Sequence, residues 1–228
     1  MESEILLTGG RITQGVVLIG DHVHRPQCAN AEFVHSVLQH LTGKNIPFAP
    51  RYLGVDAKGR EILTFMEGNV PDNLGQYSAE QCAAAAKIIR ELHNALSDFP
   101  NCPEGMTVCH NDLSPCNFAF INDLPAAVID WDAAAFGDPL DDLAYAAWMW
   151  LDIGNDENDP AFVCDGIRAM LSAYGAEKNA NLCNRMLRQM ARVGRGIFPT
   201  EEQTRATRRW TESCRSWLKS FMQNYPDL

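Results

Sequence analysis

The chain has 228 residues, of which 46% are hydrophobic and 21% charged, a mixture typical of folded globular proteins and not of disordered or fibrous ones. This length allows one large domain or two small domains packed together. The formal net charge of −10 at pH 7 argues against a general nucleic-acid-binding protein, because such proteins present a basic surface to phosphates.

No segment is typical of export or membrane insertion. No stretch approaches the ~18 uninterrupted apolar residues that a membrane span needs. The first residues, Met-Glu-Ser-Glu, lack the basic region of a secretory signal. The eight cysteines form no C-x-x-C pair, which argues against a zinc site or a thioredoxin-like motif. We therefore expect a cytoplasmic protein with reduced thiols and with neither membrane nor nucleic acid as a partner.

The first part of the chain predicts strands with one helix. Short β-rich runs at residues 4–8, 15–20 and 23–25 come first. Asn30 is a candidate N-cap for a helix that ends at Gly43 and carries apolar residues at i, i+3, i+4 and i+7. A hairpin is then expected from residues 52–55 and 61–66, before a Pro/Asp/Asn/Gly-rich linker at 70–75.

The rest of the chain predicts mainly helices. Ser78 with Gln81, and Thr200 with Gln203, have the spacing of a capping box, so a helix is expected to begin after each. Helical periodicity also marks residues 140–151 and a segment around 182–193. Two short strands, at 118–121 and 126–129, are expected to pair across residues 122–125.

A dense polar cluster lies in the middle of the chain. Asp112 and Asn117 are five residues apart in a loop before one expected strand, and Asp130 follows the next strand. Because a hairpin folds its second strand back beside the first, we expect these three side chains to converge.

This trio suits phosphoryl transfer. The reaction needs a carboxylate that orients an attacking hydroxyl and accepts its proton, and Asp112 fits that role. It also needs oxygen ligands for Mg²⁺, which the amide of Asn117 and the carboxylate of Asp130 can supply. The alternative interpretation is an acidic turn cluster that binds no metal.

Three motifs surround the trio within about residues 105–148. They read His110-Asn111-Asp112-Leu113-x-Pro115-x-Asn117, then Ile129-Asp130-Trp131-Asp132, then Gly137-Asp138-Pro139-x-x-Asp142-Leu143-Ala144. Together they resemble the aminoglycoside phosphotransferase and choline kinase family, whose members have a protein-kinase-like fold.

The resemblance implies ATP and Mg²⁺ as cofactors and a role for each matched residue. Asp112 matches the catalytic aspartate, while Asn117 and Asp130 match the two magnesium ligands. Asp142 is similar to the acid that braces the catalytic loop from beneath, and His110 to a residue that shapes this loop.

The nucleotide-binding half resembles the family less clearly. Gly10 lies in a turn where a phosphate-covering loop is expected, but its surroundings fit no phosphate-loop motif. Arg25 stands in the register of the family's phosphate-binding lysine. Glu32 is either its helix partner or an ordinary first-turn acid. Glu67 lies where a hinge between lobes is expected to contact adenine through backbone groups.

The acceptor is indicated only by hints that point in different directions. An acidic stretch with Asp152 and Asp156 either holds the ammonium groups of an aminoglycoside or is a solvated loop. Asp132 either faces the substrate or is a surface acid. Four aromatic residues are either part of a box for a quaternary ammonium group or part of the core: Trp131, Tyr145, Trp148 and Trp150.

We therefore expect an α+β, two-lobed, protein-kinase-like fold. Residues 1–67 would form a β-rich nucleotide-binding lobe with one helix, and residues 68–228 a larger, mainly helical lobe for catalysis and substrate binding. The expected function is ATP- and Mg²⁺-dependent phosphorylation of a hydroxyl on a small molecule, aminoglycoside-like or an amino alcohol. The alternative is a pseudoenzyme that binds nucleotide or a small ligand without transferring phosphate.

Overall fold

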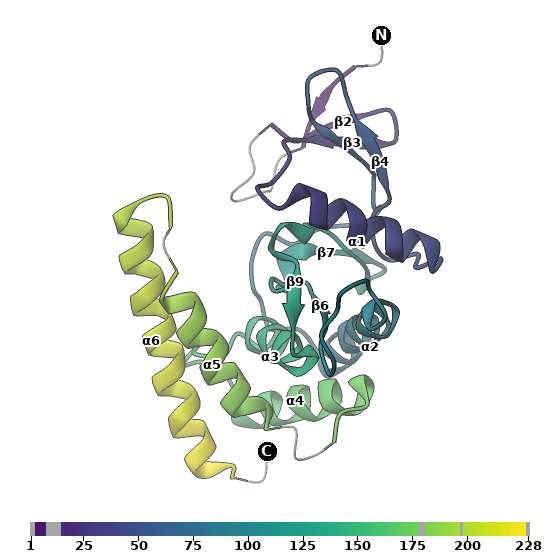
Figure 1. The fold of residues 1–228 in the computed structure, drawn as a ribbon. Coiled ribbons are helices and arrows are strands. Elements are labelled where there is room, and N and C mark those ends of the chain that lie inside the picture. Colours follow the sequence, from purple (N-terminus) through teal and green to yellow (C-terminus); the bar gives the residue numbers. More distant parts are fainter. Residues whose placement is uncertain (1–2, 8–14, 178–180, 197, 227–228) are drawn as a thin grey trace.

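The structure is a computed structural model that describes residues 3–7, 15–177, 181–196 and 198–226. It has two lobes, a small N-terminal sheet with helix α1 beneath it and a larger, mainly helical lobe (Figure 1). The expected α+β class and two-lobed arrangement are thus confirmed.

The N-terminal lobe is a five-stranded antiparallel sheet in the order β1-β2-β3-β5-β4. Its strands are β1 (Ile5–Leu6), β2 (Val17–Ile19), β3 (His22–Arg25), β4 (Tyr52–Val55) and β5 (Glu61–Thr64). Helix α1 (Ala31–Gly43) buries the apolar face that its periodicity predicts.

The predicted N-cap of α1 has the right position but lacks the expected capping hydrogen bond. Asn30 does occupy the N-cap position, but its side chain makes no capping hydrogen bond. The Asn30 amide instead donates to Ala134 O in the helical lobe, at 3.1 Å. A tertiary hydrogen bond has therefore replaced the local one that the sequence indicated.

The segment that follows the N-terminal lobe is held to β7 of the helical lobe by backbone hydrogen bonds next to Gly68. Asn69 N–H donates to Phe120 O at 2.9 Å, and Phe120 N–H donates to Asn69 O at 2.8 Å. Gly68 has a φ of +136°, and a Cβ there would lie 2.7 Å from Phe120 O, so only glycine fits without a shift. The lobe boundary between residues 67 and 68 remains a prediction; it falls at this joint.

The helical lobe contains α2 (Ala79–Leu96), α3 (Pro139–Trp150), α4 (Pro160–Tyr174), α5 (Leu182–Gly194) and α6 (Glu201–Asn224). Both predicted capping boxes are present, at Ser78 for α2 and at Thr200 for α6. Helices α5 and α6 form a hairpin along one side of the lobe (Figure 1). In the described ranges, no helix is long and apolar enough to cross a membrane.

Two small antiparallel sheets carry the loops between these helices. Strand β6 (Thr107–Cys109) pairs with β9 (Ala135–Gly137), and β7 (Phe118–Ile121) pairs with β8 (Leu124–Val128). The second hairpin was predicted with a four-residue connection, but only Asn122 and Asp123 form its turn, and both have positive φ. The sequence did not predict the β6–β9 pair or helix α4.

Candidate active site

The catalytic loop brings Asp112 and Asn117 into direct contact. A turn of 3₁₀ helix at Pro115–Asn117 ends the loop, and Asn117 is buried there. The Asn117 Nδ2 atom donates to Asp112 Oδ2 at 2.9 Å and to the Asp112 backbone carbonyl at 2.8 Å. These two bonds hold the loop as a closed ring.

The third residue of the predicted trio, Asp130, is attached to the same loop through the backbone. Ile129 N–H donates to Asn117 O at 2.9 Å, so the end of β8 lies against the loop. Asp130 has left-handed backbone angles of φ 61° and ψ 68°, and its side chain is 40% exposed. The structure therefore places the Asp130 backbone beside the loop that carries Asp112 and Asn117, as the hairpin argument predicted, while the Asp130 side chain pairs with Arg25.

The donor atoms of this trio fit a hard divalent cation. Because Asn117 Nδ2 is used by Asp112, the amide oxygen is the atom that remains for a ligand. Asp130, which follows the Ile129–Asn117 backbone bond, adds a partly exposed carboxylate that pairs with Arg25. Mg²⁺ prefers such oxygen ligands and keeps several positions for water and phosphate oxygens, so two protein ligands are sufficient.

Asp142, on α3, holds the start of the loop from beneath. Its carboxylate accepts the backbone N–H groups of His110 and Asn111, both at 2.8 Å, and His93 Nε2 at 3.1 Å. Burial alone would raise the pKa of Asp142, but the His93 hydrogen bond, nearby histidines and the His110 N–H hold it below its usual value. The geometry agrees with the predicted bracing role.

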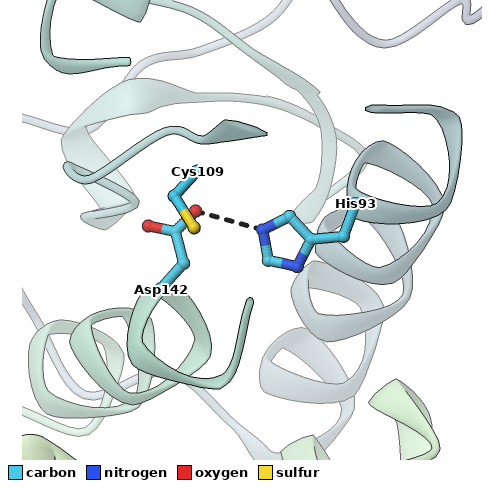
Figure 2. Close-up of side chains that lie close together, drawn as sticks. All are labelled: His93, Cys109 and Asp142. Atoms are coloured by element: carbon cyan, nitrogen blue, oxygen red, sulfur yellow. Dashed lines mark hydrogen bonds and ion pairs between the residues drawn. The ribbon is translucent and has the colours of Figure 1, made fainter. Parts of the chain in front are cut away.

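Figure 2 shows that His93 and Asp142 lie close to Cys109, a set of residue types that can bind metals. Each member already has a partner in the fold. His93 Nδ1 accepts from the Tyr174 hydroxyl at 2.8 Å, and the Cys109 thiol donates to Asp138 O at 3.5 Å. Burial raises the pKa of the Cys109 thiol far above its usual value, so it stays protonated. The cluster is a hydrogen-bonded brace and not a metal site.

His110 lies inside the loop and links it to β8. Its Nε2 atom donates to Ile129 O at 3.0 Å, and its Nδ1 atom accepts the Asp112 N–H at 3.3 Å. Since both ring nitrogens are used by backbone groups, the ring is not free to act as a base. This arrangement matches the predicted role in shaping the loop.

Arg25, on β3, reaches across from the N-terminal lobe to the acids of the helical lobe. It forms ion pairs with Glu61 at 3.0 Å and with Asp130 at 3.1 Å, and it also pairs with Asp132. Burial alone would lower the pKa of this 7%-exposed arginine, but Asp130, Asp132 and Glu61 raise it overall. The guanidinium therefore stays charged and joins the two lobes.

The acid that faces Arg25 from the N-terminal lobe is Glu61 and not Glu32. Glu61 is the cross-strand partner of Arg25 on β5, is 2% exposed, and also pairs with His35 at 2.7 Å. Glu32 is exposed in the first turn of α1, as expected for an ordinary first-turn acid. Of the two alternatives for Glu32 the structure thus supports the first-turn acid, and it gives Arg25 a cross-strand partner that the sequence alone did not indicate.

The remaining predicted positions differ in exposure, and one of them lies outside the described residues. Glu67 is exposed in the link between the lobes, and Gly10 falls outside the described residues. Asp152 is half-buried in the loop after α3 and accepts the Asn155 amide at 3.0 Å, whereas Asp156 is exposed.

Of the two alternatives for the four aromatic residues, the structure supports core packing, with one polar contact in addition. Trp131, Trp148 and Trp150 are all buried, at 3%, 1% and 0% exposure. Tyr145 is different, because its hydroxyl donates to Asp112 Oδ1 at 2.7 Å. The sequence offered a signal for this contact only in hindsight: Tyr145 follows Asp142 by three residues and so shares its helix face.

Sequence comparisons match the part of the chain that contains this site. Residues 99–178 match the model of the phosphotransferase enzyme family. This range contains Asp112, Asn117, Asp130 and Asp142. A curated relative, the trifolitoxin immunity protein of Rhizobium leguminosarum bv. trifolii, is 29% identical over 201 residues, covering 78% of this chain and 76% of the relative.

Solved structures share the whole fold at low sequence identity. An amicoumacin kinase in complex with AMP-PNP, Ca²⁺ and Ami has a TM-score of 0.68 at 8% identity, over 93% of this chain and 88% of that one. A choline kinase of Cryptosporidium parvum Iowa II has a TM-score of 0.60 at 14% identity, over 100% and 90%.

An aminoglycoside phosphotransferase of Streptomyces rimosus, bound to ADP and streptomycin, has a TM-score of 0.56 at 14% identity, over 93% of this chain and 92% of that one. The resemblance inferred from the motifs is therefore confirmed, and the chain has the protein-kinase-like fold of the aminoglycoside phosphotransferases and choline kinases.

Proposed function

We propose that the chain is an ATP- and Mg²⁺-dependent kinase that transfers the γ-phosphate to a hydroxyl of a small molecule. The match to the phosphotransferase family supports the general class. The observation that carries the proposal is the convergence of Asp112, Asn117 and Asp130 on one loop, held by the Asn117–Asp112 contact and the Ile129–Asn117 backbone bond.

In this proposal Asp112 is the catalytic base. Its carboxylate orients the acceptor hydroxyl and takes its proton as the bond to phosphorus forms. Asn117 and Asp130 hold Mg²⁺, which when bound neutralises charge on the phosphate oxygens. Asp142 and His110 keep the loop in place through the backbone bonds described above.

The nucleotide side of the proposal uses the N-terminal lobe. Arg25 is assigned to the phosphates, Gly10 to the turn that covers them, and the backbone near Glu67 to adenine. To reach a phosphate, the Arg25 guanidinium has to release Asp130 and Asp132, while Glu61 can continue to hold it from its own lobe. Nucleotide binding would thus exchange one set of anions for another around the same arginine.

The proposed acceptor is an aminoglycoside-like molecule or an amino alcohol, and we place the reaction in the cytoplasm. Asp152 and Asp156 are assigned, with Asp132, to the ammonium groups of such a molecule. The relative named as an immunity protein, together with the structural neighbour that holds streptomycin, favours a protective role over a metabolic one.

One observation favours the alternative, a pseudoenzyme that binds a ligand without phosphoryl transfer. Arg25 already neutralises Asp130 and Asp132, the acids on the metal side. A pseudoenzyme would keep this arrangement permanently, whereas a kinase would open it when Mg²⁺ and ATP bind.

ADP release with Mg²⁺-ATP tests the proposal over a panel of aminoglycosides, choline, ethanolamine, homoserine, amino sugars and macrolides. We expect acceptor-dependent release that falls about 10²- to 10⁴-fold in Asp112→Asn, while far-UV circular dichroism is unchanged. Undiminished turnover in that variant would contradict the assignment of Asp112. Binding of ATP that is indifferent to Mg²⁺, with no release for any acceptor, would favour the pseudoenzyme.

A further inference from the structure

Tyr145 contacts the proposed catalytic base, Asp112, but belongs to none of the three sequence motifs described above. It lies at the middle of α3, one turn after the bracing residue Asp142, and is 8% exposed. Its hydroxyl donates to Asp112 Oδ1 at 2.7 Å, while Asn117 donates to Asp112 Oδ2 at 2.9 Å. Each oxygen of the Asp112 carboxylate is therefore held by a different element of the fold.

The Tyr145 ring itself contacts two further side chains. Trp148 packs edge-on against it, with ring centroids 5.8 Å apart. The Arg192 guanidinium of α5 also lies over the ring, 5.9 Å from its centroid, and donates to Asn111 O at 3.3 Å. Arg192 thus touches both the aromatic ring and the catalytic loop.

We propose that Tyr145 is a positioning residue that sets the orientation of the Asp112 carboxylate toward the acceptor, and that Arg192 supports it from α5. The inference rests on the proposed kinase function. A carboxylate rotates about its last torsion unless both oxygens are held, and here one bond from α3 and one from the loop prevent that rotation.

With both oxygens hydrogen-bonded, the Asp112 carboxylate can still act as a base. A carboxylate oxygen has two lone pairs, so an oxygen that accepts one hydrogen bond from Tyr145 or Asn117 can still accept a proton from the acceptor hydroxyl. Burial and the nearby Asp112 charge raise the pKa of Tyr145 well above its usual value, so the hydroxyl remains a donor. It is therefore suited to hold the base and not to replace it.

The test removes the Tyr145 hydroxyl and keeps the ring. We expect Tyr145→Phe to lower kcat roughly 10- to 100-fold, since a misplaced catalytic group can cost about 100-fold. The KM for ATP should change less than about twofold, because the hydroxyl contacts Asp112 and not the proposed nucleotide residues. Tyr225→Phe, at the C-cap of α6, removes a tyrosine hydroxyl from a different helix and serves as the matched control.

A second variant keeps the test decisive should Tyr145→Phe fail to fold. Arg192 is exposed, so we expect Arg192→Gln to fold and to lower kcat by about 3- to 10-fold through the looser Tyr145 ring. Arg188→Gln is its control, because Arg188 is exposed one turn earlier on α5 and pairs with Asp141. We expect this control to retain the kcat of the unmodified protein.

The acceptor for these assays is the panel member that gives the fastest ADP release. If no panel member gives faster release than ATP hydrolysis alone, kcat is measured for hydrolysis, with water as the acceptor. Unchanged kcat in Tyr145→Phe and Arg192→Gln, with Asp112→Asn inactive, would overturn the positioning role and leave the kinase standing. A fall in kcat matched by an equal rise in the KM for ATP would also overturn it. Full turnover in Asp112→Asn, or none in the unmodified protein, would overturn the kinase itself and this inference with it.

Discussion

The two halves of the candidate site are built in different ways. On the helical side, Asp112, Asn117, Asp130 and Asp142 belong to one continuous segment, and hydrogen bonds to backbone groups join Asp142, Asn117 and Ile129 to the catalytic loop. On the N-terminal side, the Arg25 side chain is held by ion pairs, with Glu61 and with acids more than 100 residues away. The catalytic loop is thus fixed by hydrogen bonds within its own segment, whereas Arg25 joins the two lobes through ion pairs that the proposed binding of nucleotide would exchange.

The largest effect is expected at the brace of the catalytic side. Asp142→Asn replaces a buried carboxylate that accepts two backbone N–H groups and His93. Breaking such a buried charged network costs about 3–5 kcal/mol. Urea unfolding should therefore show a free energy of unfolding lower by that amount, and turnover should be lost. Unchanged stability would mean that the loop does not depend on this residue.

The lowered pKa of Asp142 predicts that the free energy of unfolding depends on pH. The folded pKa of Asp142 lies below its usual value, so the stabilisation is complete above the unfolded pKa of about 4. It is lost as the pH falls through the folded pKa. Unfolding free energies measured from pH 6 down should therefore decrease less in Asp142→Asn than in the unmodified protein. Parallel curves would contradict the ionised state of Asp142.

A smaller effect is expected at the joint between the two halves. Gly68→Ala places a Cβ 2.7 Å from Phe120 O, whereas Gly54→Ala, at a similar positive φ, meets nothing within 4 Å. Both variants carry the backbone strain of about 1 kcal/mol, but only Gly68→Ala adds the clash. In urea unfolding, we expect Gly68→Ala to lose about 1–2 kcal/mol more of the free energy of unfolding than Gly54→Ala does. Equal losses would show that the joint tolerates movement of the strands.

The smallest effect separates the two interpretations of Arg25. Arg25→Lys keeps the charge, so we expect its Mg²⁺-ATP affinity in calorimetry to stay within about threefold of the unmodified protein. Arg25→Met removes the charge and should weaken binding by about tenfold, which corresponds to 1.4 kcal/mol. If Arg25→Met instead binds Mg²⁺-ATP with unchanged affinity, Arg25 serves only to hold the two lobes together through its ion pairs. The pseudoenzyme interpretation then gains support.

The sequence predicted best what depends on short spacing. The capping boxes at Ser78 and Thr200 and the contact of Asp112 with Asn117 involve residues within five positions of each other, and the hairpin brings the backbone before Asp130 to the same loop. These features follow from local hydrogen bonding and hairpin geometry, which a sequence states directly.

The misses all involve partners brought together by tertiary structure. Glu61 was not predicted as the partner of Arg25, because the sequence alone does not show that β5 lies next to β3. Asn30 bonds Ala134 across the lobes instead of capping its helix. The Tyr145–Asp112 contact joins α3 to the catalytic loop across 33 positions. No local pattern specifies any of these pairs.

The measurement that tests the account most directly is mass-spectrometric detection of a phosphorylated acceptor formed from Mg²⁺-ATP. With the acceptor that gives the fastest ADP release, the unmodified protein is expected to yield a product carrying one added phosphoryl group on a hydroxyl. Asp112→Asn is expected to form it at least about 100-fold more slowly. ADP release without any phosphorylated acceptor, or equal product from Asp112→Asn, would contradict the assignment of this site to hydroxyl phosphorylation.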